Sequence, residues 1–308
     1  MHLTAMAVPG SGDTAGLDAL LDDIVAAESA GYSRIWLPQM PAIPGASPWD
    51  ALTTLALAGS RTSRIELATG VAIAYHQHPL TLARQALTTN AAVGGRLTLG
   101  IGVGHPSHIE ALGYPYERPV AYLREYLEIL IPAMSGAAMD HHGSRLTAVG
   151  QVDLPGAGAP PVVLAALGPR MLDLAGELGD GTVTTWTGPK TLEDNIIPRI
   201  TKAAAAAGRA APQVIAGLPV VVTNDADAAR ESLSAAYSYT GDMPSYRAVL
   251  AAEGASGVGD VSIVGDDAQV ARQLRRFAEI GVTEFVALPY GDPATVTRTT
   301  ELLAALRL

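Results

Sequence analysis

The sequence predicts an α/β protein, a (β/α)8 TIM barrel with insertions, and three observations support this prediction. Short apolar runs with strand character alternate with amphipathic helical patterns along nearly the whole chain, as in repeated βα units around a parallel sheet. There are eight such strand candidates, which favours a closed barrel over an open sheet. The length of 308 residues is usual for one barrel and sufficient to bury a large core.

Each element has its own signal in the sequence. The strand candidates lie near residues 2–8, 33–38, 65–73, 96–103, 161–166, 182–186, 214–222 and 284–288. Helical patterns lie near residues 15–31, 48–59, 79–93, 117–134, 169–179, 189–207, 226–238, 267–280 and 293–306. Pro48 and Pro79 mark helix starts, where a missing N–H costs nothing, and we expect His78 to cap the second of these helices.

Two stretches interrupt this alternation. Residues 138–160 are rich in Gly, Pro and His and predict a small hairpin insertion after the fourth helix. Residues 239–262 predict a longer excursion before the last βα units, and excursions of this length on a barrel usually form lids or oligomer contacts. Because no Ser-, Gly- or Pro-rich linker divides the chain, we expect a single domain over residues 1–308.

The composition limits the possible partners. Charged residues make up 16% of the chain and the formal charge is −10 without any basic block, which argues against a nucleic-acid surface and is compatible with a homodimer interface. The chain has no cysteine, so thiolate metal sites and cysteine nucleophiles are excluded. With no basic leader and no apolar run of membrane length, we expect a cytoplasmic enzyme that acts on a small molecule away from membranes.

The most informative segment is residues 96–105, where a buried strand candidate runs into alternating glycines and ends on His105. Glycines let bare backbone approach a ligand, but in a strand they also mark bulges or tight packing. The spacing does not match the dinucleotide fingerprint, and His105-Pro106 follows where that motif needs a helix. His105 is a candidate proton donor near neutral pH; alternatively it hydrogen-bonds loop backbone or a cofactor phosphate.

In a barrel of this kind the chemistry gathers at the carboxyl ends of the strands. The loops there are more apolar than charged, which suits a planar organic ligand better than a metal cluster. The segment Thr69-Gly70-Val71 can hold a bulge against a flat ring, or it is plain barrel core. The positions are Pro9, Trp36, Gln39, 69–74, 102–105, 165–168, 185–187 and 289–291.

Residues 165–171 close a strand and open a helix. The free N–H groups at such a helix start can hold a phosphate, with Arg170 as a nearby positive charge. The alternative is an ordinary βα loop with Pro169 in the first helical turn. Both interpretations stay open on these residues alone.

Other chemistries have weak support. The histidine pairs 76 and 78, 105 and 108, and 141 and 142 have no convincing carboxylate at ligand spacing, so we expect no metal site. The chain has neither a Gly-x-Ser-x-Gly elbow nor a Walker Gly-Lys-Ser/Thr motif, which disfavours serine hydrolases and nucleotide hydrolases.

Taken in order, several segments resemble the luciferase-like monooxygenase superfamily, and within it the deazaflavin (coenzyme F420)-dependent oxidoreductases of actinobacteria. Each segment is modest, but their succession over nearly the whole chain is specific. The matching segments are residues 30–39, 62–71, 78–79, 94–102, 117–119, 165–171, 174–181, 263–265 and 280–285.

The resemblance implies a (β/α)8 barrel whose strand ends hold a deazaflavin or flavin. It also implies a cis peptide between Gly70 and Val71 behind the ring, and a cofactor phosphate held by the backbone from Leu167 to Met171. The cofactor-binding residues that we expect are Trp36, Gln39, Thr69, Gly70, Val71, Gly102, Val103, Gly104, His105, Ala166, Leu167, Gly168, Pro169, Arg170 and Met171.

The sequence departs from the family pattern at two places. Several deazaflavin enzymes of this superfamily have an Asp-His pair where this chain has Pro38-Gln39, and a Glu where it has His105, so a sugar-phosphate dehydrogenase is not expected. The resemblance favours hydride transfer between coenzyme F420 and an activated C=C or C=N bond, with His105 as the catalytic residue. The alternatives are an FMN-dependent monooxygenase and a non-catalytic deazaflavin-binding protein.

Overall fold

The computed structural model describes residues 1–7, 16–40 and 49–306, which form two compact units. The first unit comprises residues 1–6, 30–32 and 166–308, and the second comprises residues 7–29 and 33–165. Pro9 and Pro48, two positions named from the sequence, lie outside the described residues.

The sheet of the second unit consists of parallel strands in the order β2, β3, β5 and β8. A short strand, β4, also pairs with β5, because the predicted strand over residues 65–73 is interrupted in the middle. All six residues of β5 are buried, as expected for a central strand covered on both faces. The bounds are β2 (Arg34–Leu37), β3 (Glu66–Thr69), β4 (Ala72–Ile73), β5 (Leu97–Gly102) and β8 (Val162–Ala165).

The helices of this unit begin at the caps that the sequence supplies. The carboxylate of Asp50 accepts a hydrogen bond from the N–H of Thr53 at the start of α2. The ring of His78 accepts one from the N–H of Leu80 at the start of α3, which confirms the predicted cap. The bounds are α1 (Leu17–Ser29), α2 (Ala51–Arg61), α3 (Pro79–Ala92), α4 (Pro106–Ala111) and α5 (Pro119–Met134).

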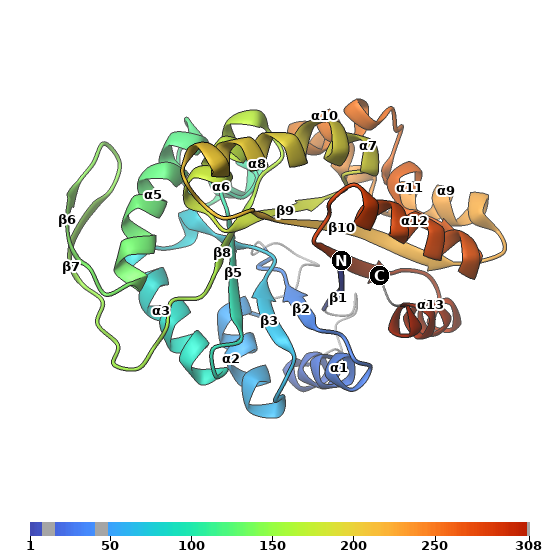
Figure 1. Ribbon diagram of the computed structural model, residues 1–308, viewed down its shortest axis with the longest axis horizontal. Coiled ribbons are helices and arrows are strands. Elements are labelled where there is room, and N and C mark those ends of the chain that lie inside the picture. Colours follow the sequence, from blue (N-terminus) through green and yellow to red (C-terminus); the bar gives the residue numbers. More distant parts are fainter. Residues whose placement is uncertain (8–15, 41–48, 307–308) are drawn as a thin grey trace. The chain divides into compact units, whose positions relative to one another are not determined.

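The predicted insertion is an antiparallel hairpin of β6 (Ala138–His142) and β7 (Thr147–Gln151), which lies beside α5 (Figure 1). Glu125 on α5 holds its turn, since the carboxylate accepts hydrogen bonds from the N–H groups of Arg145 and Leu146 and from the hydroxyl of Ser144. A Cβ at position 143 would lie 1.9 Å from an oxygen of Glu125, so glycine there lets the carboxylate approach the turn.

The first unit has parallel strands in the order β10, β12 and β1, with β9 on the other side of β10. The short strand β11 (Ile263–Gly265) pairs with the carboxyl end of β10. Each unit thus contributes four long parallel strands with their helices, and the fold class is the predicted (β/α)8 barrel. The bounds are β1 (His2–Met6), β9 (Gly181–Thr185), β10 (Gln213–Val222) and β12 (Glu284–Pro289).

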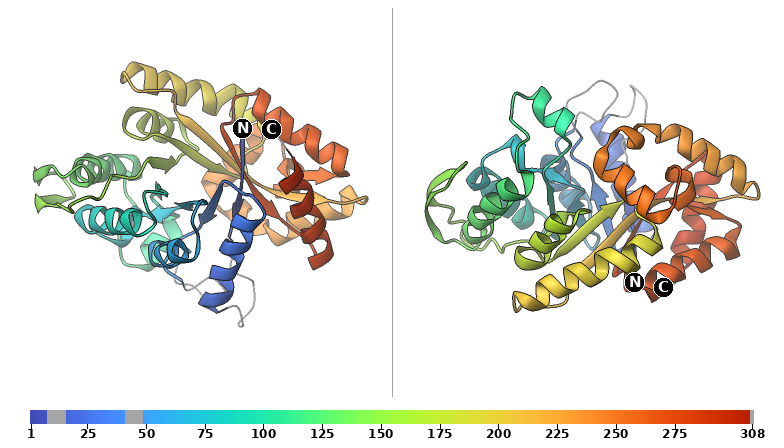
Figure 2. Two further views of the ribbon diagram at one scale, coloured as in Figure 1. Left: turned by 60° about the horizontal axis from the view of Figure 1, so that its bottom comes forward. Right: turned by 90° about the horizontal axis from the view of Figure 1, so that it is seen from above.

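Helices of the first unit pack closely where small residues allow it. Helices α6 and α8 lie side by side (Figures 1 and 2), and a Cβ at Gly176 of α6 would lie 2.7 Å from the carbonyl oxygen of Ile200. The bounds are α6 (Pro169–Leu178), α7 (Pro189–Thr191), a π-helical turn η2 (Leu192–Ile196), α8 (Ile197–Ala206), α9 (Ala226–Ala236), α12 (Asp267–Glu279) and α13 (Pro293–Ala305).

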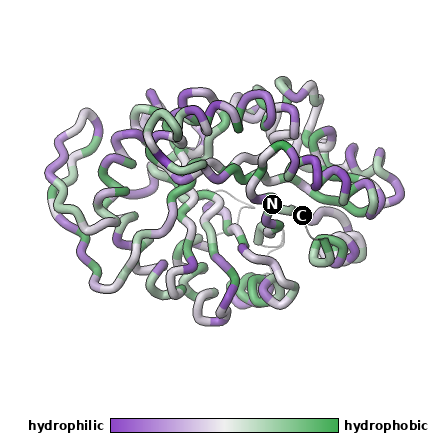
Figure 3. The backbone as a smooth tube through the Cα atoms, in the orientation of Figure 1, coloured by the Kyte–Doolittle hydropathy of each residue, from purple (hydrophilic) through white to green (hydrophobic). Residues whose placement is uncertain are grey.

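The predicted excursion over residues 239–262 is helical. It contains the 3-10 turn η3 (Ser238–Asp242) and the helices α10 (Pro244–Glu253) and α11 (Val258–Val261). Helix α12, which follows β11, is amphipathic. It buries Val270, Leu274 and Phe277, and hydrophobic and hydrophilic positions alternate along it (Figure 3). The amphipathic pattern that predicted this helix is therefore its packing pattern.

One sequence-based inference about the glycine segment is wrong. We expected no helix after His105, but α4 begins at Pro106. His105 takes an extended conformation, with φ −101° and ψ 144°, and Pro106 occupies the first helical position, where its ring and missing N–H are tolerated. The spacing of the glycines still differs from the dinucleotide fingerprint.

We predict that Glu125→Gln lowers the free energy of unfolding by about 1–3 kcal/mol at pH 7, because a neutral amide accepts hydrogen bonds less strongly than a carboxylate. Burial raises the pKa of Glu125, but the hydrogen bonds from Arg145, Leu146 and Ser144, with the His141 imidazole 3.5 Å away, together lower it below its ordinary value. The stabilisation is therefore present above the pKa of the unfolded chain and is lost as the pH falls through the lower, folded-state pKa.

Urea unfolding at pH 7 and at acid pH measures this difference. The matched control is Glu117→Gln, since the side chain of Glu117 is exposed and pairs with Arg145 at 3.6 Å. Equal losses for the two variants at pH 7, or a difference that persists in acid, would contradict this account of the hairpin.

Candidate functional site

In the second unit, the candidate site begins at the interruption between β3 and β4. The peptide bond between Gly70 and Val71 is cis, as the resemblance implies. Neighbouring strands hold the segment on both sides: the N–H of Gly70 donates to the carbonyl of Leu37 at 2.8 Å, and the Thr69 hydroxyl donates to the carbonyl of Gly100 at 2.7 Å. Thr69 is completely buried, so its side chain serves this contact.

The glycines of β5 allow the two strands to approach. A Cβ at Gly100 would lie 2.1 Å from the carbonyl oxygen of Thr69, and one at Gly102 would lie 3.0 Å from a methyl group of Val71. Gly104 has a φ of 69°, a conformation that favours glycine. Gly100 and Gly102 therefore allow close packing against residues 69–71, whereas Gly104 lies against Ile73 and Ile109.

Residues at these strand ends remain partly accessible. Gly70, Val71, Val103, Gly104 and His105 are half-buried, whereas Gly102 between the two segments is buried. Gly70, Gly102 and Gly104 have no side chain, so the side chains of this surface are those of Val71, Val103 and His105. Such a surface can lie against a flat, mostly apolar ring.

His105 is the ionisable group of this surface. Its carbonyl accepts hydrogen bonds from the N–H groups of His108 and Ile109, and its ring meets that of His108 edge to face at 5.8 Å. Burial lowers the pKa of His105, and the nearby His108 lowers it further. The imidazole is therefore mainly neutral at pH 7.

Trp36 and Gln39, predicted to line a ring pocket, have structural contacts that the sequence did not indicate. Trp36 is completely buried, and the guanidinium of Arg34 lies 5.8 Å from the centre of its ring. The side-chain oxygen of Gln39 accepts a hydrogen bond from the N–H of Ala51, at the start of α2. Their contact with a cofactor stays a prediction.

Sequence analysis missed a group of tyrosines next to this surface. Tyr75, in the 3-10 turn η1 (Ala74–His76) after β4, stacks on Tyr122 with ring centres 4.0 Å apart and lies 5.9 Å from Tyr116. The hydroxyl of Tyr116 donates to the carbonyl of Gly104 at 3.0 Å. No periodic pattern joins these positions, so only the number of tyrosines between residues 114 and 126 could have indicated the group.

In the first unit, the predicted phosphate loop leads into α6. Gly168 is the N-cap residue and is exposed, and a Cβ there would meet no atom within 4 Å. Its lack of a side chain is thus not required by packing within the protein. Pro169 and Arg170 are exposed and Leu167 is half-buried. Ala166 and Met171 are buried and anchor the loop.

The hydrogen bonds of this loop leave donors at the helix start. The N–H of Met171 donates to the carbonyl of Gly168, and the carbonyl of Ala166 accepts from the hydroxyl of Thr182. Within the described part of the chain, no hydrogen bond is seen from the N–H of Gly168 or Arg170, and Arg170 makes no ion pair. The loop can therefore hold an anion at its helix N-terminus.

In residues 1–7, 16–40 and 49–306 there is no group of three or more His, Cys, Asp or Glu side chains that could hold a metal ion. Within the same ranges, no helix is both long enough and apolar enough to span a membrane.

Comparison with known proteins identifies the family. The family model of the luciferase-like monooxygenases matches residues 1–297. The chain belongs to this family. A 5,10-methylenetetrahydromethanopterin reductase of Archaeoglobus fulgidus is 33% identical over 209 residues, which cover 67% of this chain and 61% of the relative. An F420-dependent glucose-6-phosphate dehydrogenase of Nocardia farcinica is 31% identical over 192 residues, 59% of this chain and 56% of the relative. The matches thus span about three fifths of these relatives.

Solved structures of the family share the fold over nearly the whole chain. The F420-dependent tetrahydromethanopterin reductase of Methanopyrus kandleri superposes with a TM-score of 0.78 at 22% identity, covering 99% of this chain and 97% of that one. A type II Baeyer-Villiger monooxygenase of Pseudomonas putida in complex with FMN gives 0.79 at 19% identity, covering 99% and 97%. Structures named for either cofactor therefore share this luciferase-like fold.

We predict that Tyr75→Phe leaves the stability unchanged or raises it by up to about 1–3 kcal/mol. The hydroxyl of Tyr75 is buried and has no hydrogen-bond partner among the described residues, so its removal relieves a desolvation cost. The matched control is Tyr126→Phe, because the buried hydroxyl of Tyr126 donates to the carbonyl of Gln77 at 3.0 Å and its loss destabilises the fold. Thermal unfolding compares the two variants, and a loss of stability in Tyr75→Phe as large as that in Tyr126→Phe would refute the prediction.

Proposed function

We propose that this protein is a coenzyme F420-dependent oxidoreductase that transfers a hydride to or from a small organic substrate, with reduction of an activated C=C or C=N bond as the reaction. The observation that carries this proposal is the half-buried, glycine-containing segments Gly70–Val71 and Val103–His105, at the strand ends where the resemblance puts the ring. Relatives named as F420-dependent support the choice of cofactor.

The residues present fit such a cofactor. The backbone of residues 70–71 and 102–104 would lie against the ring, where the lack of bulky side chains allows contact. The loop from Leu167 to Met171 would hold the phosphate, since Gly168 leaves room for it and Arg170 supplies a positive charge. When bound, the deazaflavin supplies a hydride at its C5 carbon.

His105 would hold the proton that completes the reduction. Addition of a hydride to one carbon of the double bond leaves an electron pair on the other atom, and the imidazolium of His105 transfers its ring proton there. Because the pKa of His105 is lowered by burial, its cationic form is a stronger acid than an ordinary histidine. The surrounding backbone orients the substrate and keeps water out.

A second candidate function is an FMN-dependent monooxygenase, which the FMN-bound structure of the same fold supports. A third is a deazaflavin-binding protein without catalysis, since the fold does not determine the chemistry.

A homodimer and a cytoplasmic location, expected from the composition, are also part of the proposal. Light scattering after gel filtration tests the homodimer, and cell fractionation tests the location.

Reconstitution of the purified protein tests the proposed cofactor. We expect coenzyme F420 to bind and its reduced form to be oxidised by an electron-poor alkene or imine without oxygen. Gly168→Ala should weaken cofactor binding with little loss of stability, because the new methyl group enters the space beside the phosphate. Tight binding of FMN with oxygen-dependent turnover, and no binding of F420, would overturn the proposal. F420 binding without hydride exchange would support the non-catalytic alternative.

We predict that His105→Asn slows substrate reduction by about 100-fold or more, the usual contribution of general acid catalysis. In the wild type, the rate should rise as the pH falls through the His105 pKa, which lies below 6.5, because the cationic form is the donor. Stopped-flow measurement of F420 oxidation over a pH series shows whether the variant loses this dependence. An unchanged rate and pH profile would remove His105 from the mechanism, whatever the cofactor.

A further inference from the structure

Trp186 has an unusual backbone conformation directly after β9. Its φ is 58°, which is uncommon for a bulky residue, and the neighbouring contacts hold it there. Its N–H donates to the carbonyl of Gly217 at 3.3 Å, and the hydroxyl of Thr187 donates to the carbonyl of Thr185 at 3.1 Å. Such conformations cost free energy and are concentrated at ligand sites.

The Trp186 ring belongs to a group of aromatic side chains within the first unit. It lies 4.6 Å from the ring of Tyr237 and 6.5 Å from that of Tyr246, and the Tyr237 ring lies 6.1 Å from that of Tyr290. Aromatic residues make up only 5% of the chain, and this is the second place, besides Tyr75 and its neighbours, where they gather. We call Trp186, Tyr237, Tyr239, Tyr246 and Tyr290 the aromatic cluster.

The aromatic cluster has a packed side and an accessible side. Tyr237 and Tyr290 pack against the buried side chains of Val221, Leu233 and Val264. Trp186 is buried as well, at 5% exposure, whereas Tyr237, Tyr246 and Tyr290 are half-buried and Tyr239 is 46% exposed, so the tyrosines form the accessible side. Burial, with smaller contributions from Tyr239 and Tyr290, raises the pKa of Tyr237 to about 12, so its phenol is neutral at physiological pH.

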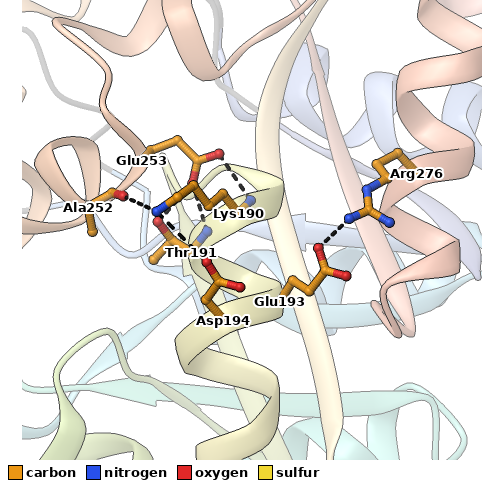
Figure 4. A network of polar contacts seen from close by, with 7 residues as sticks. All are labelled: Lys190, Thr191, Glu193, Asp194, Ala252, Glu253 and Arg276. Carbon is orange, nitrogen blue, oxygen red and sulfur yellow. Dashed lines mark hydrogen bonds and ion pairs between the residues drawn. The ribbon is translucent and has the colours of Figure 1, made fainter.

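Glu253 joins α10, which carries Tyr246, to residues 190–191, which follow Trp186 (Figure 4). Its carboxylate accepts hydrogen bonds from the N–H of Lys190 at 3.1 Å and from the N–H and hydroxyl of Thr191, both at 2.8 Å. In return, the ammonium of Lys190 donates to the carbonyl of Ala252. The helix dipoles favour both contacts, because the Glu253 carboxylate lies at the start of α7 and the Lys190 ammonium lies at the end of α10. The helix that carries Tyr246 is thereby joined to the segment after Trp186.

The space between these segments is tight. A Cβ at Gly188 would lie 2.4 Å from the carboxyl carbon of Glu253, so glycine is needed for the contact. Nearby, Glu193 pairs with Arg276, which joins η2 to α12 (Figure 4). The charges drawn there are thus engaged with one another or with helix ends, and the cluster itself consists of neutral rings.

We propose that the aromatic cluster binds a neutral, planar aromatic or conjugated compound. The inference goes beyond the proposed function, because it is argued from residues of the first unit alone. Trp186 and Tyr290 directly follow β9 and β12, at the strand ends where barrels of this kind bind ligands. Flat neutral rings stack on aromatic side chains, whereas an anion would lose its hydration there without a positive partner in the cluster.

Calorimetric titration of the cofactor-free protein tests this proposal with two probes that share a ring, neutral 1-naphthol and anionic 1-naphthalenesulfonate. We expect 1-naphthol to bind at least tenfold more tightly. Tyr237→Leu should weaken its binding by about tenfold, and Trp186→Leu by at least as much. Because Tyr237 is half-buried, its variant supplies a folded protein even if Trp186→Leu does not fold.

Phe277→Leu is the matched control, since Phe277 is a buried aromatic residue that packs on Phe285 outside the cluster. It should lower the melting temperature and leave 1-naphthol binding unchanged. Cluster variants that lose stability but bind 1-naphthol like the wild type would overturn the proposal, as would equal binding of the two probes or no binding of either. These titrations contain no F420, so a failure here leaves the reconstitution result for the cofactor standing, and the reverse also holds.

Discussion

The close approach of β5 to the segment between β3 and β4 is the contact on which the candidate site depends. Gly100 leaves no room for a side chain beside the carbonyl of Thr69, and the Thr69 hydroxyl donates to the carbonyl of Gly100 in return. In the ladder beside this contact Ala72 pairs with Ile101 and Ile73 with Gly102, so residues 103–105 continue β5 beyond its paired part. A methyl group on β5 would separate the two segments, and the partly accessible surface would be divided.

The fold was largely predictable because its periodic signals agree with its packing. All eight long strands lie where apolar runs predicted them, and α12 buries the stripe that its pattern indicated. The failures have local physical causes. The third strand is divided around Gly70, where the chain leaves the regular ladder. The helix after His105 was missed because, at six residues, it is too short to show a periodic pattern.

The candidate site was predictable in position but less so in its contacts. Gly168 and the segment 102–105 lie at strand ends, as the alternation of strands and helices implied. The contacts of Gln39 with Ala51 and of Glu253 with Thr191 join residues distant in sequence, and no periodicity indicates them. The completely buried indole of Trp36, with the Arg34 guanidinium 5.8 Å from its ring centre, is likewise set by tertiary packing. Tertiary packing sets these contacts, so the sequence pattern alone could not predict them.

The central claim is that backbone at the strand ends of the second unit receives the ring of coenzyme F420. The most direct measurement is a crystal structure of the protein with this coenzyme bound. The account predicts the ring against Gly70, Val71 and Gly104, and the phosphate within hydrogen-bond distance of the N–H groups at Gly168 and Arg170. A ring bound away from residues 70–71, or a phosphate held by another loop, would contradict it.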